Sequence, residues 1–243
     1  MSSVSNNETN PIIYWEYDNY DREIYFISWS PNENYLAFAD GDLKILYFNG
    51  SMYWHLSLAN KTIKTFSWNP DGELIAVTTD SLIDYDIQES QIFIYNVSNK
   101  SLVACTHVFY NVTISSLEWP LPNIIFIVFS NNTLSLFNVS SLNSEIIIIN
   151  GSIIDASYSV VNDNIGVIYH TSSQYKLMII NTNGTILCDT IITDSYDVFD
   201  LHWLPNGYGV VISTYNEVLI YSLNGTIIWS NNQFTYLIVE IDV

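Results

Sequence analysis

Hydrophobic and polar positions alternate in short runs along most of the chain, and Asn, Gly, Pro and Asp separate the runs. The apolar runs are rich in Ile, Val, Tyr and Phe, which favour strands, whereas the separating residues favour turns. The clearest stretch is FSWNPDGELIAV at 66–77, followed after a gap by QIFIYNVSNKSLVAC at 91–105. Together they predict a strand ending in Trp, a Pro-Asp-Gly turn, and then three further strands.

Versions of this four-strand unit recur along the whole chain. The first strand of each unit is expected at 25–31, 64–70, 115–121, 154–160 and 199–205. Four units carry Trp at the same place, and Tyr158 takes that place in the fourth: the tryptophans are Trp29, Trp68, Trp119 and Trp203. The unit averages about 43 residues, which lies in the range of propeller blades.

The pattern Trp-x-Pro-x-Gly/Asn-x-x-Leu/Ile-Ala, followed by an apolar strand ending near Tyr95-Asn96, resembles WD40-like repeats over about residues 23–230. The resemblance implies an all-β, WD40-like β-propeller with five blades. Two segments, 11–18 and 235–243, are left over, and we expect them to meet and help close the ring, because propellers hide their edges in this way. Six blades, one of them incomplete, is the alternative. We expect residues 1–10 to form a disordered tail and residues 11–243 to form a single domain.

Charge narrows the range of partners. The chain has 25 Asp plus Glu against 6 Lys plus Arg, so its formal net charge is −19, yet charged residues make up only 13% of it. Phosphate groups would repel so acidic a surface, which argues against a nucleic-acid partner. No apolar run has the ~18 residues that a membrane helix needs, so we expect no membrane insertion. Cys105 and Cys188 fall in expected outer strands of different repeats, and we expect no disulfide between them.

The most informative short motif is Asn-x-Ser/Thr, the acceptor for N-glycosylation, which occurs at about twice the frequency expected by chance. Its eleven instances begin at Asn7, Asn49, Asn60, Asn96, Asn99, Asn111, Asn131, Asn138, Asn150, Asn183 and Asn224. Five of them fall at the turn after the third strand. Asn-Gly is also a favoured hairpin turn, which explains the Asn and the Gly but not the Ser or Thr that follows. Except for Asn7 in the expected tail, these asparagines are our glycosylation candidates.

A second feature is the acidic insertion TDSLIDYDIQES at 79–90, which lengthens the second repeat. Its carboxylates are the hard oxygen ligands that Ca²⁺ takes, but the glycine turn and spacing of a known calcium loop are absent. We therefore expect a solvated acidic loop and the preferred contact site for a partner protein. The candidate residues are Asp80, Asp84, Asp86 and Glu89.

No motif for catalysis, for a cofactor or for a metal is visible, and none of these sites is expected. Four histidines lie in separate repeats without metal-ligand spacing: His55, His107, His170 and His202. His202 could line the central channel, although a structural role is favoured. Propeller enzymes assemble their sites from distant loops, so carboxylates converging on inner strands with perturbed pKa values would favour an enzyme.

Three functions stay open. The first is a non-enzymatic structural or adhesive protein outside a cell, in a larger assembly such as a virion. Low charge density, scarce Lys and the excess of glycosylation motifs resemble exported and virion proteins of thermoacidophilic archaea and their viruses. At pH 2 to 3 most of the −19 charge would be neutralised, because the reference pKa values of Asp and Glu are about 3.9 and 4.3. The second is an intracellular interaction scaffold in the cytoplasm, and the third is a propeller hydrolase or lyase.

Overall fold

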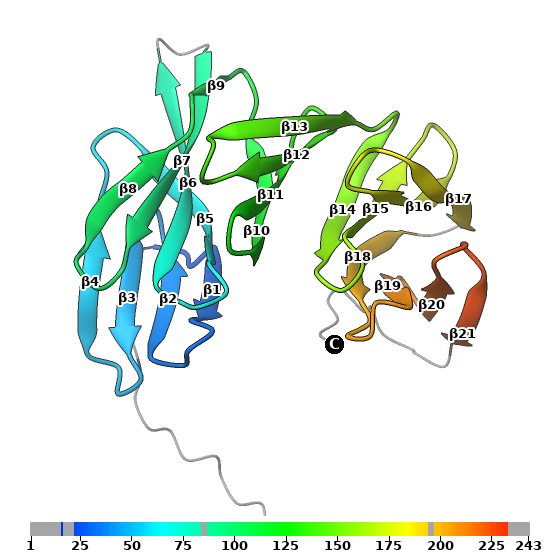
Figure 1. Cartoon of the computed structure of the whole chain (residues 1–243), viewed down its shortest axis with the longest axis horizontal. Coiled ribbons are helices and arrows are strands. Elements are labelled where there is room, and N and C mark those ends of the chain that lie inside the picture. Colours follow the sequence, from blue (N-terminus) through cyan, green and yellow to red (C-terminus); the bar gives the residue numbers. More distant parts are fainter. Residues whose placement is uncertain (1–15, 17–21, 84–86, 194–196, 233–243) are drawn as a thin grey trace, which may run out of the picture.

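The computed structural model describes residues 16, 22–83, 87–193 and 197–232. Its strands form five antiparallel sheets, each built from four strands that follow one another in the chain. The second sheet gains a fifth strand, β9, which pairs with β7. Figure 1 shows the sheets in succession along an arc. The predicted all-β class and the four-strand repeat are confirmed.

The strands fall close to their predicted positions. The first two sheets contain β1 (Phe26–Trp29), β2 (Tyr35–Ala39), β3 (Leu43–Tyr47) and β4 (Met52–Leu56), and then β5 (Thr62–Trp68), β6 (Leu74–Ile83), β7 (Ile87–Asn96), β8 (Ser101–Cys105) and β9 (Phe109–Tyr110). The third sheet contains β10 (Ile114–Leu121), β11 (Ile124–Phe129), β12 (Thr133–Asn138) and β13 (Asn143–Ile148). The last two contain β14 (Ser152–Ser159), β15 (Asn164–His170), β16 (Tyr175–Asn181) and β17 (Ile186–Thr193), and then β18 (Val198–Trp203), β19 (Gly209–Thr214), β20 (Val218–Ser222) and β21 (Ile227–Asn231).

The Pro-Asp-Gly turn predicted after the second Trp joins β5 to β6. Gly72 has a φ of 74° and donates its N–H to the carbonyl oxygen of Asn69 over 2.9 Å. The side-chain oxygen of Asn69 accepts the N–H of Leu74 over 2.7 Å. A positive φ is cheap for glycine, so this residue lets the chain reverse within one tight turn.

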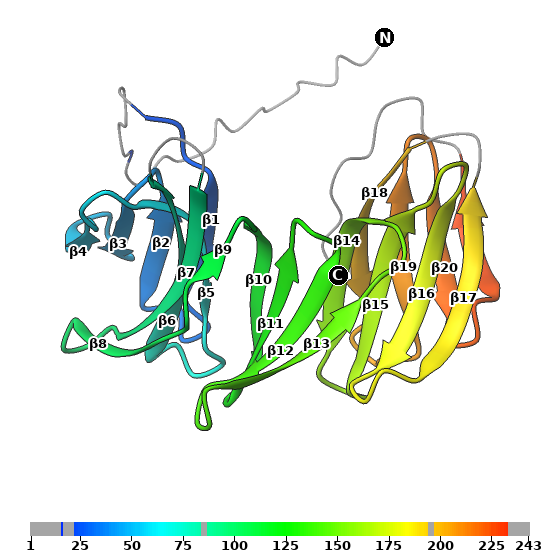
Figure 2. The same ribbon diagram turned by 90° about the horizontal axis from the view of Figure 1, so that it is seen from above.

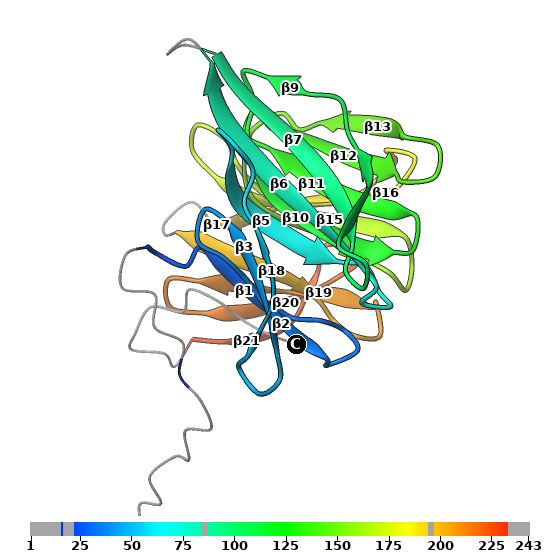
Figure 3. The same cartoon turned by 90° about the vertical axis from the view of Figure 1, so that its left-hand side faces the viewer.

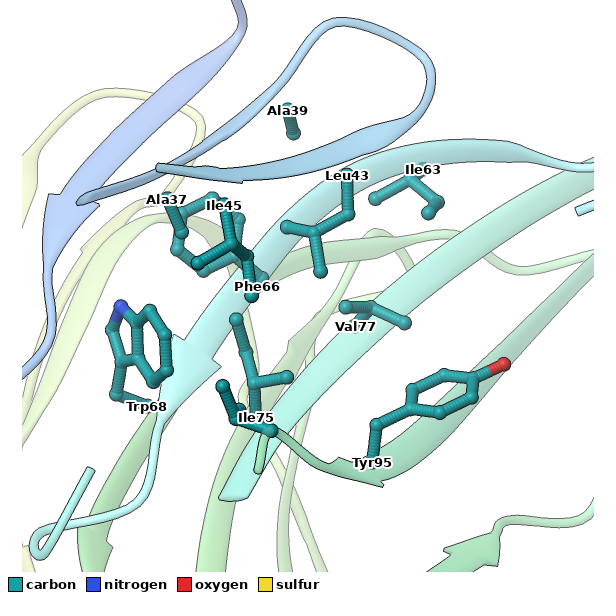
Figure 4. Packing of buried hydrophobic residues seen from close by; sticks show 11 residues of the cluster. Ala37, Ala39, Leu43, Ile45, Ile63, Phe66, Trp68, Ile75, Val77 and Tyr95 are labelled. Atoms are coloured by element: carbon teal, nitrogen blue, oxygen red, sulfur yellow. The ribbon is translucent and has the colours of Figure 1, made fainter. Parts of the chain in front are cut away.

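The core consists of four hydrophobic clusters, one between each pair of successive sheets. Figure 4 shows the first cluster, in which Ile45 of the first sheet lies against Phe66 of the second. Both side chains are buried. Figure 2 shows the sheets from above, side by side with their faces together. The chain thus buries both faces of its central sheets, as the continuous apolar runs in their middle strands require.

The aligned Trp residues do not all lie in the core. Trp68 and Trp119 are 6% and 4% exposed, and each packs in the cluster formed with the preceding sheet. Tyr158 takes the same place between the third and fourth sheets, and Trp203 is half-buried between the fourth and fifth. Trp29 is 49% exposed, because no described sheet precedes the first one. The aligned aromatic residue therefore packs between sheets in the four repeats that a described sheet precedes.

Ring closure stays a prediction. Figures 1 and 2 show the first and last sheets apart at the two ends of the arc. The two segments expected to close the ring, 11–18 and 235–243, lie almost entirely outside the described residues, as does the expected tail at 1–10. The five sheets agree with five blades, and the blade count and the single-domain boundary remain expectations.

Candidate functional site

The predicted glycosylation asparagines lie in turns between strands. Eight of the ten are exposed, and two are half-buried, Asn96 and Asn138. Asn7 lies outside the described residues. In Asn-Gly-Ser at 49–51, the side-chain oxygen of Asn49 accepts both the N–H and the hydroxyl of Ser51, over 3.0 and 2.7 Å. The hydroxyl or N–H two residues after the asparagine makes the same contact in six further motifs, which begin at Asn96, Asn99, Asn131, Asn138, Asn183 and Asn224.

This contact explains the Ser or Thr at the third position of the motif, which the turn preference of Asn-Gly leaves unexplained. The Asn side chain accepts a hydrogen bond from the Ser or Thr two residues later, which closes a local turn. The contact thus gives the Ser or Thr a structural role in seven of the motifs, and glycan occupancy stays a prediction.

The acidic insertion forms a hairpin arm where the sequence favoured a loop. β6 and β7 stay paired from Leu74↔Asn96 to Ile83↔Ile87, and their arm projects beyond the neighbouring sheets in Figures 1 and 3. The hydroxyl of Ser90 donates to Asp80 across this extension, and β9 adds a strand beside it through the pairs Glu89↔Tyr110 and Ser90↔Phe109. The prediction of a loop is therefore wrong for residues 79–83 and 87–90.

Two of the four predicted partner-contact residues, Asp80 and Glu89, lie on the described strands of this arm. Asp80 accepts the hydroxyl of Ser90 across the ladder over 2.5 Å, and both Asp80 and Glu89 are half-buried. Tyr110 of β9 pairs with Glu89. Asp84 and Asp86 lie outside the described residues. The structure thus places Asp80 and Glu89 on the same arm, and their role in binding stays a prediction.

A second group of polar side chains lies on the first strands of the sheets, which contact one another along the inside of the arc. In each case a side chain accepts a backbone N–H from the next sheet. Ser67 Oγ accepts the N–H of Trp119 over 3.0 Å, and Glu118 Oε2 accepts that of Tyr158 over 3.1 Å. Asp155 Oδ2 accepts that of Leu201 over 2.8 Å. These three contacts are here called the inter-sheet staples. They join the second sheet to the third, the third to the fourth, and the fourth to the fifth.

Two of the staples are carboxylates in a poorly hydrated place. Burial raises the pKa of Glu118 to about 7, although the hydrogen bonds from Tyr158 and Ser157 act in the opposite direction. Burial likewise raises the pKa of Asp155, and the neighbouring Asp200 carboxylate raises it further. A carboxylate deprived of water prefers its neutral form, and a second carboxylate nearby has the same effect.

Asp155 also belongs to a small cluster. Asp200 accepts the N–H of Leu201 over 3.1 Å, the same N–H that Asp155 accepts. Asp200 Oδ2 lies 3.6 Å from His202 Nε2, and the side chain of His202 is 42% exposed. Two carboxylates and an imidazole therefore meet on the first strands of the fourth and fifth sheets. Such a cluster can hold and move a proton.

Sequence reasoning missed the staples. Glu118 immediately precedes the aligned Trp, and Asp155 and Asp200 stand three residues before the aligned aromatic residue of their own repeats. A carboxylate inside an otherwise apolar strand was the available signal. That signal does not identify the hydrogen-bond partner, because a single sequence does not show which neighbouring strand offers an N–H.

Two further observations bear on function. Among the described residues, no group of three or more His, Cys, Asp or Glu side chains is placed to hold a metal ion. The described part of the chain also contains no helix of the length and apolar character needed to cross a membrane. Cys105 and Cys188 are both free thiols, on the outer strands β8 and β17.

Comparison with known proteins points to one family. Residues 27–83 match the model of the anaphase-promoting complex subunit 4 WD40 domain. The match covers the first sheet and the start of the second. No curated protein matches the chain. The match and the repeated four-strand sheets agree with the resemblance drawn from the sequence, whereas nothing in the comparisons supports the likeness to exported or virion proteins of archaea.

Proposed function

We propose that this chain, which carries WD40-like repeats, is a non-enzymatic interaction protein that binds other proteins within a larger assembly. WD40 domains typically act as interaction scaffolds, and a rigid set of sheets with projecting loops suits that role. The single observation that carries the proposal is the number of large apolar side chains left exposed on the outer strands.

Those outer strands form the rim of the molecule. On β13, Ile146 and Ile148 are 64% and 78% exposed, and on β21, Ile228 and Trp229 are 57% and 47% exposed. Exposed apolar side chains that lie next to one another on a strand commonly mark sites of protein association. β13 and β21 are each the last strand of their sheet, where unpaired backbone groups are available.

The experiment is cross-linking of the protein in its native source with a carboxyl-reactive reagent, which suits a chain with 25 Asp plus Glu and 6 Lys plus Arg. We expect a defined protein partner in constant ratio, cross-linked to the arm or to the outer strands. A chain that sediments alone and yields only internal cross-links would refute the proposal.

We further propose a location outside the cell or on a virion surface, with glycans on the exposed turns. The ten candidate asparagines, the low charge density and the expected neutralisation of most carboxylates at pH 2 to 3 support this location. The intact mass of the native protein tests it. A mass above 27.8 kDa in hexose increments supports it, and the bare mass of 27.8 kDa favours the cytoplasmic scaffold.

The cluster of Asp155, Asp200 and His202 favours a second candidate, a propeller hydrolase or lyase, because it brings carboxylates and an imidazole together on inner strands. If the protein is such an enzyme, it turns over substrates in a screen of esters and glycosides. Asp200→Asn then abolishes this turnover without changing the urea midpoint of unfolding. The non-enzymatic proposal expects no turnover by either protein.

A further inference from the structure

A cleft of about 540 Å³ opens between the third and fourth sheets, outside the staples. Its apolar part comes from Ile124 and Leu136, and its polar part includes Asn138 and Ser144. Two carboxylates, Glu145 and Asp163, also line it. Both residues are exposed, and none of the described residues around the cleft is Lys or Arg. Its size lies within the usual range for ligand pockets, ~300–1,000 Å³.

The first sheet shows what fills the equivalent place elsewhere in the molecule. Its outermost β2–β3 pair is Tyr35↔Tyr47, and the corresponding pair of the third sheet is Ile124↔Asn138. Two pairs further in, Ile45 pairs with Trp54 on β4, and Leu136 pairs with Glu145 on β13. Three aromatic residues of the first sheet are thus replaced in the third by Ile124, Asn138 and Glu145.

Between the first and second sheets these positions are packed with rings. Tyr35 stacks on Tyr53 with ring centroids 4.7 Å apart and on Trp68 at 6.4 Å. Lys100 closes the stack: its Nζ lies 4.4 Å from the Tyr53 ring centroid and donates to the Tyr53 carbonyl oxygen over 2.9 Å. Aromatic rings and an ammonium group together therefore fill this junction. Stacking and cation–π contacts of this kind stabilise a packed site.

The third-to-fourth junction offers the complementary surface without that filling. The carboxylates of Glu145 and Asp163 stand where a cation would find a partner, and Ile124 and Leu136 stand where a ring would pack. The Asp163 carboxylate already accepts the hydroxyl of Tyr158 over 2.9 Å, which fixes its direction. After Lys100 the chain has a single Lys or Arg, Lys176, and that residue is paired with Asp189 over 3.1 Å. The chain itself therefore supplies little positive charge on this side.

We propose that this cleft binds a short segment of a partner protein in which an aromatic side chain stands beside a Lys or Arg. The inference rests on the proposed interaction function and names the chemistry of the partner. The ring replaces the missing aromatic packing against Ile124 and Leu136, and the cation pairs with Glu145 and Asp163. Charge complementarity of this kind gives specificity and speeds association.

The experiment measures binding of a fluorescein-labelled peptide, Gly-Ser-Lys-Tyr-Lys-Phe-Ser-Gly, by anisotropy at low and moderate salt. The comparison peptide carries Glu in place of both lysines. We expect saturable binding of the lysine peptide that weakens with salt, and at least tenfold weaker binding of the glutamate peptide.

Two cleft variants and one control locate the site. Glu145→Lys reverses the charge, and Ser144→Tyr places a ring in the cleft; we expect each to weaken binding at least tenfold. Glu73→Lys makes the same charge change at an exposed turn of the second sheet, and we expect a change of less than threefold. Urea midpoints verify that all three variants are folded.

Absence of saturable binding, or equal affinity of Glu145→Lys and the unmodified protein, would overturn the cleft assignment. Failure of the cleft assignment can be distinguished from failure of the proposed interaction function. If the native partner is still cross-linked to the Glu145→Lys variant, the interaction function stands and only the cleft is wrong. If no partner is cross-linked to either protein, the interaction function itself fails.

Discussion

Replacement of Glu118 by Gln tests whether a buried carboxylate controls how stability depends on pH. The amide keeps an oxygen that can accept the N–H of Tyr158, which the Glu118 carboxylate accepts over 3.1 Å, but the side chain no longer ionises. Below about pH 4.5 the glutamate is neutral in both the folded and the unfolded chain, so the substitution should change stability little there. As pH rises, the unfolded chain ionises first and the folded chain then bears the cost of the charge, so the substitution should matter increasingly.

The sign and size follow from the two pKa values. The Glu118 pKa is about 7 in the folded chain, against 4.5 for an unperturbed glutamate. Between these pH values the folded chain binds more protons than the unfolded chain, so the free energy of unfolding falls as pH rises. The loss amounts to about 3 kcal/mol, is absent below about pH 4.5, and is complete above about pH 7.

The assay is urea unfolding from pH 4 to 8, followed by tryptophan fluorescence, for which Trp119 lies next to the substituted residue. We expect the free energy of unfolding of Glu118→Gln to fall less as pH rises. Above pH 7 it should exceed that of the unmodified protein. Glu73→Gln removes an equal charge from an exposed turn and controls for the general repulsion within a chain of net charge −19. If Glu118→Gln and the unmodified protein lose stability equally between pH 4.5 and 7, the carboxylate is not held neutral and the reasoning fails.

Three further predictions concern packing and turns. Trp119→Ala should cost about 3–5 kcal/mol, whereas Trp29→Ala should cost under about 1 kcal/mol, because the former side chain is 4% exposed and the latter 49%; urea midpoints compare them. Gly209→Ala should prevent stable folding, since a Cβ there would lie 2.1 Å from a backbone oxygen of the opposing strand. Gly184→Ala should cost only about 1 kcal/mol, since its φ is +83° but no atom lies within 4 Å, and thermal melting distinguishes the two. Thr185→Ala should lower stability by about 1 kcal/mol through the loss of the hydrogen bond that its hydroxyl donates to Asn183, and should remove any glycan at that turn, which peptide mass spectrometry detects.

Local patterns were sufficient to predict the all-β class and the four-strand sheets. The strand order within each sheet follows from alternating runs and turn residues, because each strand pairs with its neighbour in the sequence. The aligned Trp is the last residue of β1, β5 and β18, whereas β10 continues two residues past Trp119. It did not reveal that Trp29 is exposed, since that depends on which sheet precedes the first one rather than on the residue itself.

The candidate sites were harder to predict. The Asn-x-Ser/Thr motifs were found, but their hydrogen bond to the following Ser or Thr appears only in three dimensions. The staples depend on an N–H offered by another sheet about 40 residues away, as between Glu118 and Tyr158. The cleft depends on three replacements, among them Glu145 for Trp54, whose equivalence is visible only from the register of two separate sheets.

Hydrogen–deuterium exchange tests the central claim, that the chain is an interaction protein, most directly. The measurement compares the isolated chain with the same chain in its native assembly. We expect slower exchange in the assembly at the arm of β6 and β7, at the outer strands, and at residues 138–145 beside the cleft. Equal exchange in the two states over all these segments would contradict the claim.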